Sequence, residues 1–480
     1  MASEESLDPE NWENLRILGH KMLDDMLDYL RDIRDQPVWQ PIPKEIKLKF
    51  RAPLPKEGQD REKIYKEFKE NIFPYPLGNA HPCFWGWAVG NGTPFGVLAE
   101  MLAATMNPNL GGGEHIANYV ENQVIEWAKD VFGYGPNASG ILVSGGSIAN
   151  YIGLAVARNK KAGYDIKKEG LRKSNKELLI YGSEEMHNSI DKAIHLLGFG
   201  INSLKKIPVN DNYEIRIEKL KETIEADIKA GFKPICIIGC AGTINTGAVD
   251  NLDNLADLAR EFDMWFHIDG AFGAWCKLSP EIGDIVEGIE RADSIAFDFH
   301  KWMYMNFEAG CVLIRNREDH FETFNLTADY IAHQDRGVGS GDIWYGFYGP
   351  QLSRGFRALK IWMSIKEHGI NKYGRLIYQN IKQARYLTKL IEKEYSLELL
   401  APTTLNIVNF RYNDGKSNAN TLNKLNEEIL YQLQEKGIAV PSSTTINGNF
   451  AIRVAIVNYR SKNEDFDKLI HSVLGIVKDL

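Results

Sequence analysis

A single lysine, Lys301, follows an apolar β-type run in the segment SIAFDFHKWMYMN, residues 294–306. Lysine is normally a surface residue because its ammonium group is costly to remove from water. A lysine at the end of a buried strand is typical of an amine that its surroundings keep reactive, as a Schiff-base enzyme requires. Such an amine can hold pyridoxal phosphate (PLP), although a lone strand-end lysine is more often an ordinary ion-pair partner.

A glycine-rich segment, Gly145-Gly146-Ser147, follows the apolar run GILVS (140–144) and precedes a helical pattern. Backbone N–H groups at such a helix start can approach an anion closely, and the helix dipole favours a phosphate there. A glycine turn with a serine N-cap is the plainer alternative. The sequence has neither GxxxxGK[ST] nor a GxGxxG that opens a helix after a strand, which argues against a nucleoside triphosphate or a dinucleotide.

Three more polar side chains follow apolar runs. Asp269 ends the run WFHID, and a buried carboxylate there needs a cation or hydrogen-bond donors. The protonated pyridine nitrogen of PLP would be such a cation, and keeping that nitrogen protonated makes PLP an electron sink. A turn in which Asp269 accepts backbone N–H bonds is the alternative. His187 could stack on a pyridine ring or cap the next helix, and Thr243 could bond a cofactor or form a turn.

Six apolar runs alternate with helical patterns between about residues 80 and 375, and the polar side chains lie at their ends. The runs are GILVS (140–144), LLIYG (178–182), ICIIG (235–239), WFHID (265–269), SIAFDF (294–299) and CVLIR (311–315). Continuous apolar strands separated by helices indicate an α/β fold with a mostly parallel sheet covered on both faces. Ligands of open α/β sheets gather at the carboxyl ends of the strands, so one cofactor could contact all of these side chains.

The remaining segments predict two further units. Residues 12–33 place apolar side chains at spacings of three and four, which predicts a helix with one apolar face. The proline-bearing stretch after it is extended, so this helix packs elsewhere, on a second subunit or within its own chain. Predicted strands at 405–412 and 450–458, with helices near 418–436 and 463–478, indicate a small α+β domain after a long helix around 371–396. We therefore expect an N-terminal helical arm (1–79), a large α/β domain (80–375) and a small C-terminal domain (376–480).

Composition narrows the class of protein. A chain of 480 residues with 44% hydrophobic and 25% charged residues is typical of a globular protein with two or three domains. Its net charge of −8 argues against a nucleic-acid or anionic-membrane partner. The acidic N-terminus lacks a signal-peptide pattern, and no apolar run approaches the roughly 20 residues that span a bilayer. Five scattered cysteines, with no second Cys/His pair beside Cys236 and Cys240, favour reduced thiols in a cytoplasmic protein over a metal site.

Five blocks of the sequence resemble the pyridoxal-dependent (group II) amino-acid decarboxylases of the aromatic-L-amino-acid decarboxylase group. They are HPCFWGW (81–87), ILVSGGSIAN (141–150), WFHIDGAFG (265–273), FDFHKW (297–302) and SRGFRALKIW (353–362). The likeness covers most of the chain, with the blocks in the family's order and spacing. It implies the PLP-dependent transferase fold type I and an obligate homodimer whose active site lies at the subunit interface.

The resemblance also implies roles for single residues. Lys301 would hold PLP covalently, Asp269 would pair with the ring nitrogen, and His187 would stack over the ring. Tyr330 would protonate the substrate carbon after CO₂ leaves, on a loop that the glycine-rich run RGVGSGD (336–342) allows to move. The other expected cofactor ligands are Gly145, Gly146, Ser147, Thr243, Ala271, Asp298 and His300, with Ser353 of the partner subunit.

Aromatic side chains near the expected pocket suit an aromatic substrate. The candidate substrate contacts are Phe84, Trp87 and His81. An acidic substrate would favour an arginine, and residues 81–95 contain neither Lys nor Arg. Arg453 matches a family arginine position. We expect it to contact the residues that bind the substrate and not the substrate itself. Two segments have smaller residues than the aromatic-specific members of the family have at these positions: Ala88-Val89 and Gly111-Gly112-Gly113. The space would admit a larger substrate ring such as indole, or another group would fill it.

We expect decarboxylation of an L-amino acid to its amine and CO₂, with tryptophan, tyrosine, phenylalanine or dopa favoured as substrate. One alternative is oxidative decarboxylation to an aldehyde with consumption of O₂. Relatives of that kind typically lose the loop tyrosine or the stacking histidine, and this chain has both Tyr330 and His187. A non-aromatic substrate is a second alternative, and an inactive scaffold, which intact Lys301 and Asp269 disfavour, is a third. In each active case the chain would be a cytoplasmic enzyme of amino-acid and carboxylic-acid metabolism.

Overall fold

Seven strands form the large sheet, in the order β2-β8-β7-β6-β5-β3-β4. The computed structural model describes residues 4–171, 176–326 and 334–480. Neighbouring strands pair in parallel except β8, which is antiparallel to both β2 and β7. The strands are β2 (Ser139–Val143), β3 (Leu178–Ser183), β4 (Leu204–Ile207), β5 (Lys233–Cys240), β6 (Trp265–Asp269), β7 (Ser294–Asp298) and β8 (Gly310–Ile314).

The structure confirms the six strands predicted from apolar runs and the mostly parallel α/β sheet. The sequence did not reveal β4, a strand at the sheet edge that pairs only with β3. Only the first and last of its residues LKKI are buried, and two consecutive lysines between them interrupt the apolar signal. Lysines are common on edge strands because they discourage pairing with another chain.

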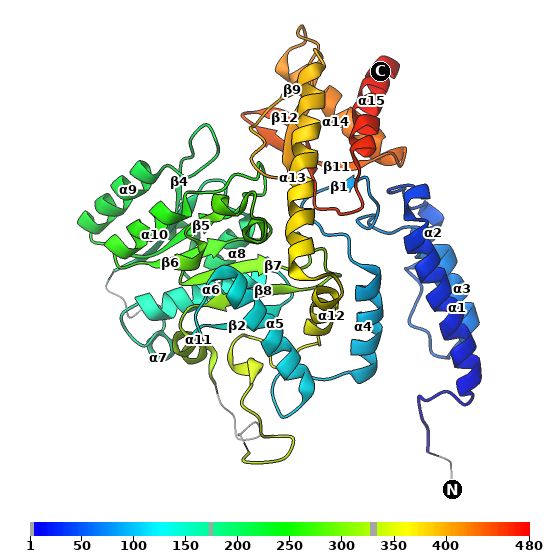
Figure 1. Cartoon of the computed structure of the whole chain (residues 1–480), viewed down its shortest axis with the longest axis horizontal. Helices are drawn as coiled ribbons and strands as arrows, with labels where there is room; N and C mark the ends of the chain where they lie inside the picture. The colour runs from blue at the N-terminus through cyan, green and yellow to red at the C-terminus, as the bar shows by residue number, and fades with distance from the viewer. Residues whose placement is uncertain (1–3, 172–175, 327–333) are drawn as a thin grey trace.

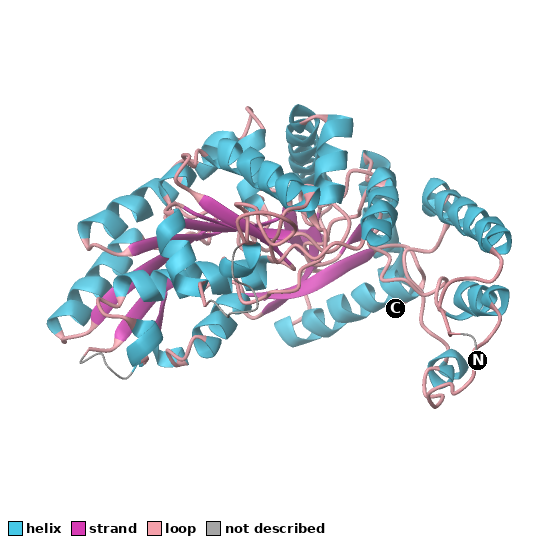
Figure 2. Cartoon of the chain, turned by 90° about the horizontal axis from the view of Figure 1, so that it is seen from below, coloured by secondary structure: helices cyan, strands magenta, loops and turns pink. Residues whose placement is uncertain are grey.

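Helices cover both faces of the large sheet (Figures 1 and 2). The helices described between residues 94 and 368 are α4 (Pro94–Met106), α5 (Ile116–Phe132), α6 (Gly146–Lys161), α7 (Ile166–Glu169), α8 (Asn188–Leu196), α9 (Ile217–Lys229), α10 (Leu252–Glu261), α11 (Arg317–Phe324) and α12 (Ala358–His368). Short 3-10 helices join them: η3 (Ile201–Ser203), η4 (Gly273–Leu278), η5 (Gly283–Val286), η6 (Ile289–Arg291) and η8 (Tyr345–Phe347).

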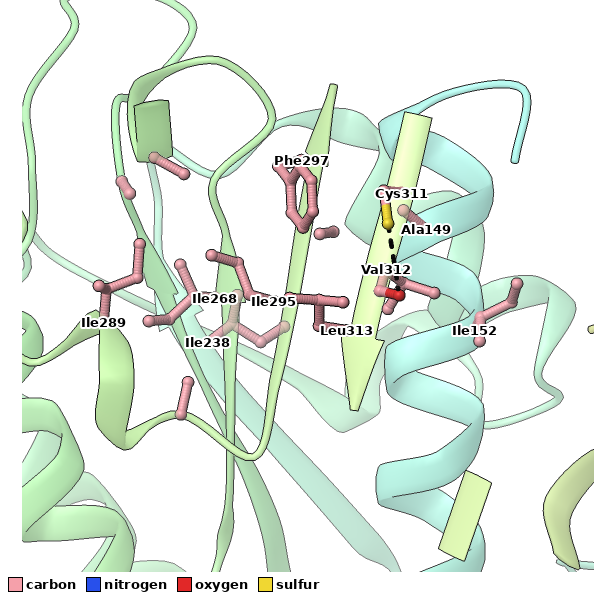
Figure 3. Packing of buried hydrophobic residues seen from close by; sticks show 14 of the residues in the cluster. Ala149, Ile152, Ile238, Ile268, Ile289, Ile295, Phe297, Cys311, Val312 and Leu313 are labelled. Atoms are coloured by element: carbon pink, nitrogen blue, oxygen red, sulfur yellow. Dashed lines mark hydrogen bonds between the residues drawn. The ribbon is translucent and has the colours of Figure 1, made fainter. Parts of the chain in front are cut away.

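Helix α6 lies across the middle of the large sheet and contacts β2, β5, β6, β7 and β8. Figure 3 shows Ala149 of α6 beside Cys311 of β8, with Val312 on the same strand and Ile152 one turn along the helix. These four side chains are buried in the main hydrophobic core. Burial of this apolar surface holds the N-terminal end of α6 at the carboxyl edge of the sheet, where the glycine-rich segment begins.

A second sheet has the order β1-β11-β12-β10-β9. Its strands are β1 (Phe84–Trp85), β9 (Leu397–Leu399), β10 (Ile407–Tyr412), β11 (Val440–Ile446) and β12 (Asn449–Ala455), covered by α14 (Ala419–Glu435) and α15 (Asn463–Asp479). Strand β1 comes from far earlier in the chain and pairs in parallel with β11. The predicted α+β segment is therefore present, and residues 84–85 complete its sheet.

The long helix α13 (Ile370–Lys393) connects the two sheets (Figure 1). Its first half places Tyr373 and Ile377 in the large core, and its second half places Leu387 and Ile391 in the core beside the small sheet. The expected boundary at residue 375 thus falls inside one continuous helix. The three-domain division remains a prediction.

The N-terminal arm consists of α1 (Trp12–Arg31), η1 (Ile33–Asp35), α2 (Lys44–Lys49) and α3 (Arg61–Asn71), which lie to one side of both sheets (Figure 1). The predicted N-terminal helix is confirmed, and the Asn11 side chain caps it by accepting N–H bonds from Glu13 and Asn14. Only Leu18 of α1 is buried, whereas Ile17, Met22 and Leu27 are exposed. The arm therefore presents apolar side chains that this chain leaves uncovered. Within the described ranges, no helix is both long enough and apolar enough to cross a membrane.

Candidate active site

A pocket of about 410 Å³ lies at the carboxyl edge of the large sheet, beside the start of α6 and the end of β7. Its lining brings together most of the residues predicted to bind the cofactor. The lining residues are Ser144, Gly145, Gly146, Ser147, Asn150, His187, Ser189, Ala271, Asp298, His300, Lys301, Phe307 and Glu308.

The start of α6 forms one wall of this pocket. Gly145 is the N-cap residue, and no side chain caps the helix. The first-turn N–H groups of a helix lack partners within the helix, so here they are available to an anion. A Cβ atom on Gly146 would lie 3.0 Å from Oδ2 of Asp298 and 3.2 Å from Cβ of Ala271. Glycine therefore lets the backbone of α6 approach the opposite wall more closely than a residue with a side chain would without a shift of its neighbours.

His300 forms the neighbouring part of the wall. Its Nδ1 accepts a hydrogen bond from the N–H of Ala309 at 3.1 Å, which places the ring proton on Nε2. Burial lowers the pKa of His300, so the ring is neutral near pH 7 and offers one N–H donor. The ring of Phe307 lies 4.3 Å from the His300 ring, between centroids. A neutral donor beside an uncapped helix start suits a phosphate.

Lys301 lies three residues after the end of β7, close to the predicted strand end. Its Nζ lies 3.0 Å from Oδ2 of Asp298, the last residue of that strand. The Asp298 side chain is 1% exposed, and that of Lys301 is 21% exposed. The amine is thus held inside the pocket by a buried carboxylate while part of its side chain remains accessible to an incoming molecule.

Asp269 lies at the end of β6 and is 6% exposed. Its Oδ1 accepts a hydrogen bond from the N–H of Ala271 at 3.2 Å, so it makes the turn contact given above as the alternative. Burial raises the pKa of the Asp269 carboxyl, and the charge of Lys301 opposes that effect. A buried carboxyl whose charge depends on nearby cations is well suited to a protonated pyridine nitrogen.

His187 combines both roles proposed for it from sequence. It is the N-cap residue of α8, and its Nδ1 accepts the N–H of Ser189 at 3.2 Å. It also lines the pocket, and burial lowers the pKa of its ring. The hydroxyl of Ser189 lies 2.9 Å from the same Nδ1. Because Nδ1 accepts from the serine, the ring is neutral and its proton is on Nε2.

A buried chain of hydrogen bonds continues from Ser189 to strand β6. The Asn150 Nδ2 donates to the Ser189 hydroxyl at 3.2 Å, and its Oδ1 lies 2.9 Å from Nε2 of His267. Nδ1 of His267 lies 2.7 Å from the hydroxyl of Ser294, which also accepts the indole N–H of Trp265. Each donor therefore meets one acceptor, and the direction of the chain determines the neutral tautomer of both histidines.

Sequence reasoning missed Asn150, Ser189 and His267. A signal was present for His267, because residues two apart on a strand share a face, and His267 precedes Asp269 by two. Asn150 lies one helical turn after Gly146, on the side of α6 that begins at the pocket. Ser189 follows His187 by two residues, but its sequence neighbourhood contains nothing that separates it from an ordinary helix cap.

Two predicted cofactor contacts, Thr243 and Ser353, and the predicted proton donor Tyr330 lie elsewhere or outside the described residues. The Thr243 hydroxyl accepts the N–H of Ala248 at 3.1 Å and lies 3.0 Å from the Thr246 hydroxyl, so it stabilises a turn. Ser353 is exposed in the single chain, as a residue that serves a second subunit would be. Tyr330 falls outside the described residues. The roles of these three residues remain predictions.

The three predicted substrate contacts are distributed around β1. His81 and Phe84 are buried, and Nδ1 of His81 accepts the N–H of Cys83 at 3.0 Å. Trp87 is 54% exposed and has a backbone φ of 54°, in the left-handed region. Arg453 donates to the Trp87 carbonyl at 2.7 Å and to the Ser442 hydroxyl at 3.1 Å. Arg453 thus acts on backbone, holding the turn that presents the Trp87 ring.

The groups that line the pocket, together with Asp269, which bonds the lining residue Ala271, fit PLP. An uncapped helix start and a neutral histidine N–H suit the phosphate, a strand-end amine suits the aldehyde, and a buried carboxyl suits the ring nitrogen. One carboxylate oxygen, Oδ1 of Asp298, is buried without a hydrogen-bond partner among the described residues. A buried polar atom without a partner is costly, which is a further sign that the pocket is built around another molecule.

Comparison with known proteins agrees with this chemistry. Residues 43–413 match the family model of the pyridoxal-dependent decarboxylase conserved domain. An aromatic-L-amino-acid decarboxylase from Bacillus atrophaeus is 32% identical, over 98% of this chain and 96% of that protein. A phenylacetaldehyde synthase from Petunia hybrida is 26% identical, over 94% of this chain and 91% of that protein. The crystal structure of Oryza sativa TDC with PLP and tryptamine has the same fold, with a TM-score of 0.88 at 21% identity over 98% of this chain and 100% of that one.

Proposed function

The chain belongs to the pyridoxal-dependent decarboxylase family, and on this premise we propose that it converts an aromatic L-amino acid to its amine and CO₂. The enzyme is a PLP-dependent amino-acid decarboxylase of fold type I. The relative from Bacillus atrophaeus carries the name of an aromatic-L-amino-acid decarboxylase, which supports an aromatic substrate here.

The charge of the pocket is the observation that carries the choice of substrate. Its described lining contains no arginine and a single lysine, Lys301, which the cofactor requires. A substrate with an acidic side chain would leave that carboxylate without a cation in this pocket, which is costly. The aromatic ring of Phe307 lies in the wall instead, and an apolar ring of the substrate would bury favourably against it.

The residues of the pocket divide the work between binding and chemistry. PLP, when bound, supplies an electron sink for the charge that remains on the substrate carbon as CO₂ leaves. The start of α6 and Nε2–H of His300 would hold the phosphate, and Lys301 would hold the aldehyde carbon. Asp269 would keep the ring nitrogen protonated, because burial disfavours its carboxylate and a nearby cation favours it.

His187 contributes as a neutral ring in a determined orientation. The hydrogen-bond chain through Ser189 and Asn150 keeps Nδ1 an acceptor and places the ring proton on Nε2 of this pocket-lining residue. A neutral ring can cover the cofactor without competing with Lys301 for Asp269. Tyr330 is the proposed proton donor to the substrate carbon, on the resemblance alone.

A homodimer with a shared active site is part of the proposal. The arm helix α1 exposes Ile17, Met22 and Leu27, which a second subunit would cover. Ser353 is accessible and would reach the phosphate of the partner subunit's cofactor. We also place the enzyme in the cytoplasm, where its five free, buried cysteines would stay reduced.

Oxidative conversion to an aldehyde is the second candidate, since the phenylacetaldehyde synthase from Petunia hybrida is also a relative. The presence of both Tyr330 and His187 favours the amine. Incubation of the PLP-loaded protein with single L-amino acids, followed by mass spectrometry, separates the two reactions. We expect tryptamine, tyramine, phenethylamine or dopamine without hydrogen peroxide. An aldehyde with stoichiometric peroxide and ammonia, or an amine formed only from acidic amino acids, would contradict the proposal.

A further inference from the structure

One buried side chain, Asn380 of helix α13, bonds the turn that carries Lys301. Its Oδ1 accepts two hydrogen bonds, from the indole N–H of Trp302 at 3.1 Å and from the hydroxyl of Tyr304 at 2.7 Å. All three of these side chains are buried. Trp302 directly follows Lys301 in the chain, so the bond to Trp302 acts on the backbone next to the reactive amine.

The orientation of the Asn380 amide is determined by its partners. An indole N–H can only donate, so the amide atom that faces Trp302 must be the oxygen. Nδ2 then donates to Oε1 of Gln383 at 2.9 Å and to the carbonyl of Asn458 at 3.0 Å. Both lone pairs of the oxygen and both hydrogens of the nitrogen are used, so this side chain is fixed in one orientation.

The same contacts join the Lys301 turn to both cores of the protein. Helix α13 contributes Ile377 to the large core and Leu387 to the core beside the small sheet, and Asn380 lies between them. Asn458 follows strand β12 of the small sheet, and its Nδ2 donates to the carbonyl of His81 at 2.8 Å. Because packed cores have little freedom to move, Asn380 gives the turn a fixed reference.

The backbone of Tyr304 shows that the turn is constrained. Its φ is 56°, in the left-handed region, which is unfavourable for a bulky residue and persists where surrounding contacts hold it. The Tyr304 N–H closes the turn on the carbonyl of Lys301 at 3.0 Å, and its ring lies 5.6 Å from the ring of Tyr459, between centroids. The bond from the Tyr304 hydroxyl to Asn380 is a further contact that holds this conformation.

His300, which forms the phosphate side of the pocket, is held by other contacts. Its carbonyl accepts the N–H of Gly90 at 3.1 Å, and its N–H donates to the carbonyl of Ala309 at 3.2 Å. Neither bond involves Asn380 or its partners. A change at Asn380 should therefore loosen the amine side of the pocket while the phosphate side keeps its geometry.

We propose that Asn380 is a positioning residue for Lys301. Through its two bonds to the turn, it holds Nζ where it can reach the aldehyde carbon of PLP while the start of α6 holds the phosphate. Overall, the Lys301 ammonium loses two of its three hydrogens, which leave with the aldehyde oxygen as one water. Its nitrogen forms the double bond to the aldehyde carbon and keeps the third hydrogen and the charge. Because the turn is fixed before PLP arrives, attachment costs less conformational freedom.

A double-mutant cycle on PLP binding tests this role in the full-length protein. Asn380→Leu removes the acceptor of both bonds, and Lys301→Ala removes the group that Asn380 positions. Isothermal titration calorimetry with PLP gives Kd for wild-type protein, both single variants and the double variant. We expect Asn380→Leu to weaken PLP binding about tenfold when Lys301 is present and less than about twofold in the Lys301→Ala background. A residue that acts through Lys301 has nothing to position there.

Asn426→Leu is the matched control. Asn426 is also a buried asparagine on a helix, and its Oδ1 accepts the N–H of Tyr412 at 2.7 Å. Its Nδ2 donates to the carbonyls of Tyr412 and Leu422, each at 2.9 Å. Both asparagine variants should lose stability in urea, but Asn426→Leu should retain the PLP affinity of its background. A loss of affinity as large as that in Asn380→Leu would overturn the proposal.

Tyr304→Phe gives the same comparison if Asn380→Leu does not fold, because it removes one donor and keeps the ring. We expect it to weaken PLP binding about threefold, again only when Lys301 is present. Equal weakening with and without Lys301, or no weakening in either background, would overturn the role of Asn380.

The proposal rests on the proposed function, because PLP must attach to Lys301. Borohydride reduction followed by intact-protein mass spectrometry measures that attachment separately in wild-type protein. Absence of the adduct would overturn both proposals. An adduct together with equal effects of Asn380→Leu in the two backgrounds would overturn only the role of Asn380.

Discussion

Nε2 of His267 lies 2.9 Å from Oδ1 of Asn150, and the two side chains are almost completely buried. This contact joins strand β6, which carries Asp269, to helix α6, which begins at the glycine-rich segment. Because the carbonyl oxygen of Asn150 accepts from the histidine, its amide group is directed to Ser189 and lowers the pKa of the Asp269 carboxyl, against the effect of burial. The two ends of the cofactor site are thereby linked by one side chain.

Replacement of Asn150 by leucine tests this link. The change leaves Nε2–H of His267 without its acceptor and removes the Asn150 donor to the Ser189 hydroxyl, so we expect a loss of about 1–3 kcal/mol of stability. It also removes a donor near Asp269, and PLP binding should weaken with it. Urea denaturation and cofactor titration by absorbance measure the two effects. Asn159→Leu, on the same helix and away from the pocket, is the control and should change neither by a comparable amount.

Lys301→Ala should abolish covalent attachment of PLP. The pocket keeps its phosphate-binding groups, so PLP should still bind reversibly, but borohydride should reduce no adduct onto the protein and amine formation should fall to background. Intact-protein mass after reduction is the measurement. Lys360→Ala removes another buried lysine, which pairs with Glu100, and serves as the comparison. Retention of a reducible adduct in Lys301→Ala would exclude Lys301 from its role.

The buried ion pair between Arg354 and Glu121 should be critical for stability. The Arg354 guanidinium contacts a carboxylate oxygen of Glu121 and donates to the carbonyl of Leu110 at 2.9 Å, and both charged side chains are buried. Arg354→Met leaves an uncompensated charge, so we expect a loss of about 3–5 kcal/mol in the free energy of unfolding. The double variant with Glu121→Leu should recover part of it. A double variant less stable than Arg354→Met would show that the pair is not the cause.

Stability should fall in mild acid because several histidines are buried in neutral form. Burial lowers the pKa of His320 to about 3, from the ordinary 6.5 of an unfolded chain. Between those pH values the unfolded chain binds a proton that the folded chain does not, so unfolding becomes easier as pH falls. The contribution is up to about 1.4 kcal/mol per pH unit.

His320→Gln isolates this effect, since the glutamine amide can still donate to the Tyr348 carbonyl that Nε2 contacts at 2.8 Å. The free energy of unfolding, measured by urea denaturation between pH 7 and pH 5, should depend less steeply on pH in this variant. The same change at the exposed His471 is the control. Equal slopes for wild-type protein and His320→Gln would contradict the assignment.

Tyr330→Phe tests whether Tyr330 donates the proton to the substrate carbon, a role that is proposed from the family resemblance alone. We expect the variant to bind PLP and substrate, since the change removes one hydroxyl, while the amine product decreases strongly. Product analysis under air should also look for aldehyde and peroxide, because loss of the proton donor would favour the oxidative reaction. An unchanged rate of amine formation would show that another group protonates the substrate carbon.

The large sheet could be predicted from the sequence by itself. So could the residues that stand where its strands end and its helices begin, at the carboxyl edge of the sheet. Apolar runs and glycine-rich turns are local signals, because a strand buried on both faces needs consecutive apolar residues and a helix that meets an anion needs glycines. Lys301, Asp269 and the glycines of α6 could therefore be found from their own neighbours in the chain. The edge strand β4 could not, since it is short and partly exposed.

Only the tertiary structure decided the partners of the buried polar groups. Asn150 and His267 are 117 residues apart, and Arg354 and Glu121 are 233 apart. A buried donor or acceptor must be paired, but the sequence does not state which distant side chain meets it. The pairing follows from how helices and strands pack. In the folded chain Asp298, at the end of a strand, pairs with Lys301. Arg453 donates to the backbone carbonyl of Trp87.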